Sequence, residues 1–243
     1  MKTMEWFETP LPASPAEPLA WDEAFLERAE HGNGGPALWF WEASAPFVVL
    51  GYGQQAAVEA DLEACAHHGV PVLRRCSGGG AVLQGPGCWN YGLVLPIPET
   101  GPLSTIPGAN AWIMDRNRAI LEGLLGRPVT VEGHTDLAID GRKCSGNAQR
   151  RKRRHLLFHG TILHGIPPGL ISRFLRFPST QPDYRLGRSH AEFVDNVPVR
   201  PDALRAAWIR GWEASPSRLP FPGEETAAAM AARYGDPAWH GRR

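Results

Sequence analysis

Leu73–Gly87 reads LRRCSGGGAVLQGPG, and the fold and the site can be inferred outward from this stretch. Three consecutive glycines at 78–80 leave a short backbone segment without any Cβ, so it can adopt positive φ and bring its N–H groups close to a ligand. Arg74 and Arg75 precede them, and a guanidinium can hold a phosphate or a carboxylate in fork geometry. Taken alone, the run fits a tight turn between two strands equally well. Its spacing matches neither a P-loop nor the dinucleotide-binding fingerprint.

A second stretch, Asp136–Leu163, reads DLAIDGRKCSGNAQRRKRRHLLFHGTIL. Lys143 follows an apolar, strand-like run, and a lysine in such a place could bridge two anionic groups and stabilise the charge that builds up between them. The dipeptide Asp140-Gly141 is a strong hairpin signal. The residues alone therefore favour a turn lysine that points to water.

Together the two stretches resemble the lipoate–protein ligase family, within the wider group of biotin/lipoate ligases and octanoyltransferases. The family pattern R-R-x-S-G-G-G-A-V stands at residues 74–82. A second pattern, G-x-K-[IV]-S-G-x-A-[QY], then a basic stretch and H-G-T, is matched at residues 141–149 and 159–161, with Cys144 at the [IV] position. Val49–Gln54 resembles the family's V-I-G-x-x-Q strand end.

The resemblance implies an α+β fold, with mixed β-sheets flanked by helices as in the class II synthetase-like catalytic domain of biotin/lipoate ligases, in a single domain over residues 1–243. It also implies a lipoate–protein ligase that uses ATP and Mg²⁺ to convert lipoate or octanoate to an acyl-adenylate. The acyl group would pass to a lysine of a lipoyl-type acceptor domain, in a 2-oxoacid dehydrogenase E2 or a glycine cleavage H-type protein.

The resemblance also assigns roles to residues. Lys143 would be catalytic, contacting the acyl carboxylate and the α-phosphate, and much of the rate would come from positioning two bound reactants. Asp136 would be a magnesium or phosphate-side ligand and His159 would line the pocket, although either could be an ordinary hydrogen-bonded core residue. The implied substrate- and nucleotide-binding residues are Arg75, Ser77, Gly78, Gly79, Gly80, Ala81, Val82, Leu83, Asp136, Lys143, Ser145, Gly146 and His159.

Three residues depart from the family pattern. Gln84 and Gly85 replace His-Asp, and Thr135 replaces Asn. Locally, residues 84–87 are closer to the His-Gly-Pro-Gly of the octanoyltransferases, so an octanoyl- or lipoyltransferase is one alternative. A non-catalytic binder of lipoate or a nucleotide is another, although a mere binder has less need of Lys143.

Octanoyltransferases use a cysteine thiolate as acyl acceptor. In one branch that cysteine stands where this chain has Leu156. In another it precedes the motif lysine, yet no cysteine occurs between Trp89 and Lys143. Cys76 and Cys144 remain as candidates, and a small buried residue is the favoured interpretation of both.

Composition limits the alternatives further. The 25 basic and 25 acidic residues balance, so no global basic field points to nucleic acid. Four cysteines without CxxC spacing indicate reduced thiols in a cytoplasmic protein. No run of about 18 apolar residues predicts a membrane helix, and the start lacks a signal peptide. The chain ends too soon for the small C-terminal domain of many lipoate ligases, so a separate small accessory subunit is a candidate partner.

Alternation and turn signals predict strands at 4–8, 37–42, 47–51, 70–75, 80–84, 89–95, 129–131, 137–139, 143–148 and 155–163. Within this set, 37–42 and 47–51 are expected to form a hairpin, and 80–84 and 89–95 to continue the sheet of 70–75. Apolar periodicity predicts helices at 19–29, 59–68, 109–125, 170–174, 201–214 and 224–234, two of which end at Gly69 and Gly126.

Two further segments carry functional hypotheses. The basic run Arg150–Arg154 could attract ATP and an acidic acceptor surface, or it could be a solvated, mobile loop. Gln181–His190 combines tyrosine, arginine and histidine and is interpreted as a loop that caps the site.

Overall fold

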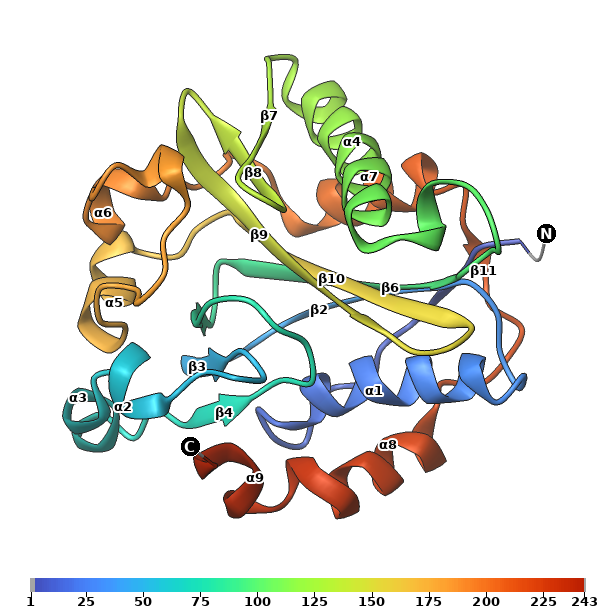
Figure 1. Ribbon diagram of the computed structural model, residues 1–243, viewed down its shortest axis with the longest axis horizontal. Helices are drawn as coiled ribbons and strands as arrows, with labels where there is room; N and C mark the ends of the chain where they lie inside the picture. Colours follow the sequence, from blue (N-terminus) through green and yellow to red (C-terminus); the bar gives the residue numbers. More distant parts are fainter. Residues whose placement is uncertain (1–2, 243) are drawn as a thin grey trace.

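An eight-stranded mixed sheet crosses the centre of the molecule (Figure 1). The structure is a computed structural model that describes residues 3–242. In spatial order the strands are β11 (Ser215–Pro216), β1 (Glu5–Phe7), β2 (Ala37–Glu42), β6 (Cys88–Pro96), β10 (His155–Leu163), β9 (Arg142–Arg151), β8 (Asp136–Ile139) and β7 (Thr130–Glu132). β1 is parallel to both neighbours, and the pairs from β2 to β7 are antiparallel. The mixed sheet with flanking helices confirms the expected α+β class.

A second sheet carries the glycine stretch and has three strands in the order β4 (Val72–Arg74), β3 (Phe47–Leu50) and β5 (Val82–Gln84). The predicted hairpin of residues 37–42 and 47–51 is wrong, because β2 pairs with β1 and β6 whereas β3 pairs with β4 and β5. The single sheet expected for 70–75, 80–84 and 89–95 is wrong for the same reason, since β6 belongs to the large sheet. β2, β3 and β6 each have neighbours on both edges, so long-range pairing overrides the local turn signal.

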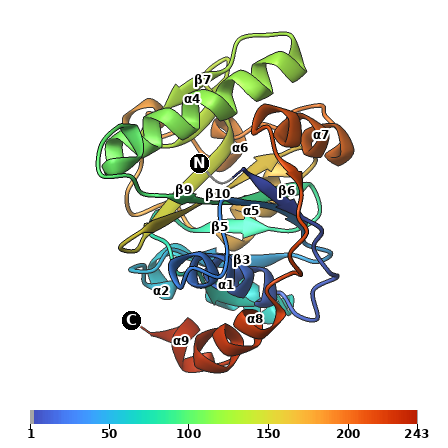
Figure 2. The ribbon, with the colours of Figure 1, turned by 90° about the vertical axis from the view of Figure 1, so that its right-hand side faces the viewer.

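Helices cover both faces of the large sheet (Figure 2). On one face, α4 (Ile106–Leu125) and α7 (Pro201–Gly211) close a core with side chains of β2, β6 and β10. On the other, α1 (Glu17–Glu30) packs with the small sheet, α8 (Gly223–Ala229) and the π-helical turn Met230–Tyr234. The remaining short helices are α2 (Ala56–Glu59), α3 (Leu62–His67), η1 (Pro102–Ser104), α5 (Pro168–Phe174), η2 (Asp183–Arg185), α6 (His190–Phe193) and α9 (Pro237–Gly241).

Local capping signals are confirmed at several ends. Gly126 has φ +65° and ends α4, and Gly69 has φ +63° just after α3. Asp140 and Gly141, with φ of +50° and +72°, make the turn between β8 and β9. The predicted helix 59–68 is wrong in one respect. Asp61 accepts a hydrogen bond from the Ala64 N–H and starts α3 anew, so that α2 and α3 are separate.

The C-terminal third departs most from the prediction. α7 ends at Gly211, three residues earlier than expected, and a Cβ on Gly211 would stand 2.2 Å from the Ile120 side chain of α4. The expected helix 224–234 is α-helical only to Ala229 and π-helical beyond. β11, α6 and α9 were not predicted. Among the described residues, no helix is long and apolar enough to span a bilayer.

Candidate functional site

The glycine loop, residues 75–81, joins β4 to β5 and folds around the Arg75 guanidinium. Arg75 donates from Nε to the Ser77 hydroxyl (3.0 Å) and from one terminal nitrogen to the carbonyl oxygens of Gly78 and Gly80 (2.5 and 2.9 Å). Burial lowers the pKa of Arg75 to about 10, which leaves the group charged at neutral pH. The resemblance implied that Arg75 contacts the adenylate. In the structure its guanidinium organises the loop from inside.

The backbone amides of this loop are left for a ligand. All three glycines at 78–80 are exposed, and within residues 3–242 their N–H groups donate no hydrogen bond. Gly79 has φ +87°, and a Cβ there would stand 3.0 Å from an Arg75 nitrogen. A short run of exposed, unpaired amides is the arrangement that binds anions.

Residues 51–54, the end of the first motif, brace the glycine loop. A Cβ on Gly51 would stand 2.0 Å from the Gly79 carbonyl oxygen, so only glycine permits this approach. The fully buried Arg74 guanidinium donates to three carbonyl oxygens of residues 51–54 and to two in the C-terminal segment, residues 240–242. Arg74 is therefore enclosed by backbone carbonyls and fixes the position of the bracing turn.

Lys143 lies on the same sheet face as the glycine loop. A Cβ built on Gly146 would stand 2.9 Å from Lys143 Nζ. A Cβ built on Gly79 would stand 3.8 Å from the Ala148 methyl group. Gly146 and Ala148 are two residues apart on β9, so they face the same side of the sheet. The two stretches that the sequence analysis singled out are thus brought together.

Lys143 forms an ion pair with Asp136, with 2.7 Å between Nζ and Oδ1. The lysine side chain is 26 % exposed and the aspartate side chain 13 %, so the pair is reachable from solvent. Tyr184, in η2, donates its hydroxyl to Asp136 Oδ2 at 2.9 Å. Burial and the adjacent Asp136 carboxylate raise the pKa of Tyr184 above its ordinary value. The segment 181–190, expected to cap the site, reaches it through Tyr184.

Asp136 could supply one ligand to a magnesium ion. Its two oxygens bond Lys143 and Tyr184, and in the described part of the chain no three His, Cys, Asp or Glu side chains gather to hold a metal. Mg²⁺ commonly takes one or two carboxylates and completes its shell with phosphates and water. A magnesium ion there would therefore have to arrive with a nucleotide and take most of its ligands from phosphates and water.

His159 links three separate segments of the chain. It lies on β10, where its Nε2 is 2.6 Å from the Ser77 hydroxyl and its Nδ1 is 2.6 Å from Asp22 Oδ2 on α1. The exposed fractions of the His159 and Asp22 side chains are 13 % and 3 %. Because Ser77 also accepts from Arg75, these hydrogen bonds run unbroken from α1 into the glycine loop.

The other residues implied by the resemblance lie around this centre. Val82 and Leu83 belong to β5, and Leu83 is part of the core, whereas Ala81 is half-buried. Ser145 is fully buried and accepts from Asn147 Nδ2 at 3.1 Å. These residues belong to the buried and half-buried scaffold around the site.

Gln84, one of the departures from the family pattern, is held by buried partners. Its side-chain amide donates to the Thr161 hydroxyl (2.8 Å) and accepts from Asn90 (2.9 Å), and Thr161 in turn donates to Asn90. Gln84 therefore has a structural role between the two sheets.

All four cysteines are free and buried. Burial raises the pKa of Cys76 to about 11 and that of Cys144 to about 12. Cys144 follows Lys143 on β9 and belongs to the core on the α4 side of the sheet. Both thiols fit the interpretation as small buried residues.

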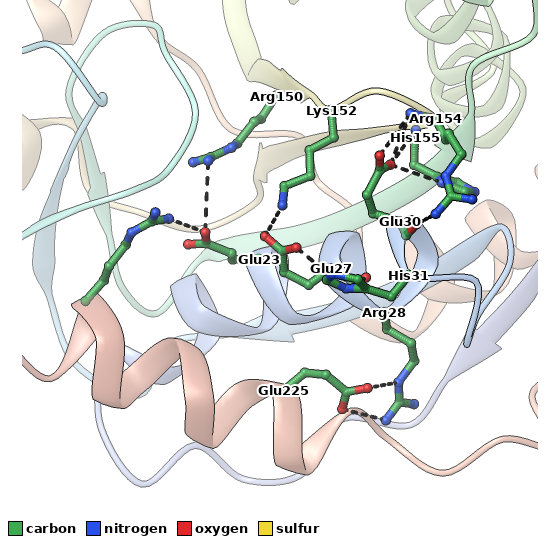
Figure 3. A network of polar contacts seen from close by, with 11 residues as sticks. Glu23, Glu27, Arg28, Glu30, His31, Arg150, Lys152, Arg154, His155 and Glu225 are labelled. Atoms are coloured by element: carbon green, nitrogen blue, oxygen red, sulfur yellow. Dashed lines mark hydrogen bonds and ion pairs between the residues drawn. The ribbon is translucent and has the colours of Figure 1, made fainter.

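The basic run 150–154 is partly paired with α1 (Figure 3). Arg150 lies 4.0 Å from Glu23 and Lys152 pairs with Glu27, whereas the Arg154 guanidinium donates to the Glu30 backbone carbonyl and only the Arg154 backbone N–H donates to the Glu30 carboxylate. Arg151 points to the other face, where it donates to the carbonyl oxygens of Leu103 and Ser104 in η1. Arg150 and Arg151 belong to β9, residues 152–154 form the turn to β10, and two of the charges expected to attract ligands already face carboxylates.

The sequence analysis missed one member of the site. Asp22 lies within the segment expected as the helix 19–29, and nothing in its sequence surroundings marks a partner on β10. A cavity of about 700 Å³ lies elsewhere, between β4, the start of α1 and the C-terminal α9. None of the residues that the resemblance assigned to the site lines it.

Comparison with known proteins gives a consistent family. Residues 14–198 match the family model described as the lipoyl protein ligase A/B catalytic domain. Octanoyltransferase LipM of Kyrpidia tusciae is 30 % identical over 93 % of this chain and 94 % of its own length. Lipoate-protein ligase A subunit 1 of Thermoplasma acidophilum is 29 % identical over 80 % of this chain and 77 % of its own.

Solved structures share the fold. A T. acidophilum structure with bound lipoic acid superposes with a TM-score of 0.82 at 21 % identity, covering 99 % of both chains. A crystal structure of lipoate-protein ligase A bound with ATP has a TM-score of 0.80 at 23 % identity, covering 99 % of both chains.

Proposed function

This chain belongs to the family of lipoyl protein ligase A/B catalytic domains, and from that premise we propose that it is an ATP-dependent lipoate–protein ligase. The carboxylate of lipoate or octanoate attacks the α-phosphorus of ATP, pyrophosphate leaves, and an acyl-adenylate forms. An acceptor lysine amine then attacks the acyl carbonyl. AMP leaves, an amide bond forms, and the amine loses a proton.

The observation that carries this proposal is the placement of Lys143 opposite the glycine loop. Its ammonium group shares a sheet face with the exposed amides of residues 78–80 and is held by one accessible carboxylate, Asp136. An acyl carboxylate and an α-phosphate between them would exchange that ion pair for contacts with both anions. Fixed positive groups at the point where charge develops favour both half-reactions. Magnesium would enter with ATP and take Asp136 as one ligand.

The buried thiols support a mechanism without a cysteine. A transferase of this family needs a thiolate that substrate can reach, and burial keeps Cys76 and Cys144 protonated at neutral pH. An octanoyltransferase is the second candidate, favoured by the LipM relatives and by the sequence at 84–87. It would require one of these thiols to become exposed on substrate binding.

The partners follow from the same reaction. The acceptor would be a lipoyl-type domain of an E2 or H-type protein, and a solved archaeal system described as a bipartite ligase with its E2 lipoyl domain is similar to this chain at 23 % identity. By analogy, a separate small accessory subunit is a second partner. Four free thiols are compatible with a reducing, cytoplasmic setting.

The test supplies purified protein with a lipoyl-domain acceptor and follows acceptor mass with lipoate, ATP and magnesium, or with an octanoyl carrier protein alone. Ligase activity gives an ATP-dependent mass gain that is lost in Lys143→Ala and kept in Cys76→Ala/Cys144→Ala and in the control Lys152→Ala. Gain from the carrier without ATP, lost with the cysteines, would refute the ligase in favour of the transferase. If no product forms with any donor, even after a small accessory subunit is added, the result would favour a binding protein over an enzyme.

A further inference from the structure

We propose that Asp22 is a positioning residue for the glycine loop and acts through His159 and Ser77. It orients the imidazole, the imidazole holds the serine hydroxyl, and the serine together with Arg75 fixes the loop whose amides face the bound anion. The inference rests on the proposed function for its consequence in catalysis, but its physical basis can be measured without any substrate.

The direction of each hydrogen bond follows from the groups involved. The Nε of Arg75 always carries a proton, so the Ser77 oxygen accepts at that contact of 3.0 Å. The serine hydroxyl proton is then free to be donated to His159 Nε2, 2.6 Å away, which must carry a lone pair. The remaining imidazole proton is on Nδ1 and is donated to the Asp22 carboxylate. One tautomer of His159 satisfies the whole chain of contacts.

The same order of groups sets the loop geometry. If the proton were on Nε2, His159 and Arg75 would both donate to Ser77, and the serine hydroxyl proton would lose its acceptor. Ser77 is 1 % exposed, so water could not replace that partner at low cost. A change of tautomer would therefore disturb the contact that orients Arg75, and Arg75 holds the carbonyl oxygens of Gly78 and Gly80.

Burial makes the charge of Asp22 a poor contributor to stability. Asp22 is 2 % exposed, and its Oδ1 has no hydrogen-bond partner within residues 3–242. Taking a carboxylate out of water with only one of its oxygens hydrogen-bonded costs free energy. We therefore expect neutralisation of Asp22 to affect the site more than the stability of the fold.

The adjacent Glu23 offers a matched control. It is on the same helix, is 5 % exposed and also carries a buried carboxylate. Its partners are Arg150 and Arg233, and it contacts neither His159 nor Ser77. Glu23→Gln therefore removes a comparable charge from α1 and leaves the three-residue chain intact.

The direct test is ¹⁵N NMR of protein labelled in its histidine rings, with His159 assigned by the signal missing from His159→Gln. We expect a protonated Nδ1 and an unprotonated Nε2 in wild type and in Glu23→Gln, and a mixture of tautomers in Asp22→Asn. A protonated Nε2 in wild type would overturn the proposal, and so would an unchanged tautomer in Asp22→Asn. The wild-type spectrum decides even where a variant does not fold.

The catalytic consequence is measured as acyl transfer to the acceptor. We expect Asp22→Asn to lower kcat/KM on the order of 10- to 100-fold, as losses of supporting partners commonly do, with partial rescue by Asp22→Glu and a change below about twofold in Glu23→Gln. Ser77→Ala should cost a similar factor, and the double variant should be no worse than the poorer single one, because both changes break one chain. Additive losses would contradict the proposal. The predicted tautomer in a protein without any acyl transfer would support the chain of contacts and refute the proposed function.

Discussion

The two ends of strand β9 carry positive charge in opposite ways. At its start, Lys143 pairs with one carboxylate, Asp136, and lies opposite exposed backbone amides. At its end, two cations of the run 150–154, Arg150 and Lys152, face carboxylates of α1 and are matched in advance (Figure 3). Arg150 and Lys152 therefore have less to offer a ligand than their charge alone suggests.

The difference lies in the spacing of the partners. Glu23, Glu27 and Glu30 are four and three residues apart, so they stand on one face of α1 and meet the strand side chains in register. Lys143 instead pairs with one carboxylate, Asp136, and Tyr184 already bonds the second oxygen of that carboxylate. An incoming anion can displace one carboxylate from Lys143 more easily than it can open a network.

The largest difference between the two ends of β9 is expected when one lysine is removed from each. Lys143→Ala should lower acyl transfer by about 10²- to 10³-fold, since a fixed positive group is lost where charge develops. Lys152→Ala removes the same side chain from the paired end and should change the rate by less than about twofold. Acceptor mass against time measures both, and equal losses in the two variants would refute the distinction.

A second test at the Lys143 end measures the reactivity of the two buried thiols, Cys76 and Cys144. With pKa values near 11 and 12, Cys76 and Cys144 should alkylate about 10²- to 10³-fold more slowly at pH 8 in the folded protein than in denaturant, because only the thiolate reacts. The rate should rise as the pH approaches those values, since the raised pKa delays deprotonation. Peptide mass mapping after iodoacetamide checks this. Rapid labelling of Cys144 in the native protein would reopen the transferase alternative.

The glycine loop at the Lys143 end depends on one close approach. Gly51→Ala should reduce the free energy of unfolding by about 1–3 kcal/mol, because the new methyl group meets the Gly79 carbonyl oxygen. Gly53→Ala, two residues away with open space around it, should stay within about 0.5 kcal/mol. Urea unfolding measures both variants. Similar midpoints would mean that the turn is not packed against the loop.

The smallest effect is expected at the paired end. Glu27→Gln breaks the contact between Glu27 and Lys152, two side chains that are each 27 % exposed. It should lower the free energy of unfolding by about 0.2–1 kcal/mol in low salt. The cost should shrink in high salt because exposed charges are screened. Thermal unfolding at two salt concentrations measures it. A loss above about 2 kcal/mol would show that the network holds α1 in place.

Local chemistry made part of this structure predictable. Gly126, Gly69 and the Asp140-Gly141 turn act through neighbouring backbone, and each does in the structure what its sequence context indicated. The segments around Lys143 and the glycine run were expected to converge because they resemble paired motifs of one family. The structure brings them to one face.

Long-range partners could not be predicted in the same way. The apolar runs of β2 and β3 fit a hairpin locally, yet each finds two other strands, and nothing in either run encodes that choice. Asp22 is 137 residues from His159 in sequence, so its role becomes visible only when α1 lies along β10. The basic run 150–154 is visible in the sequence, but its partners Glu27 and Glu30 lie on α1, more than 120 residues away.

Ligase and transferase are separated by counting the AMP released for each acceptor that is acylated. Wild-type protein with ATP, magnesium, lipoate and a lipoyl-domain acceptor should release one AMP for each acceptor that gains a lipoyl group, and Lys143→Ala should release neither at a comparable rate. Acylation of the acceptor from a carrier-bound octanoyl group, with no AMP formed, would contradict the account.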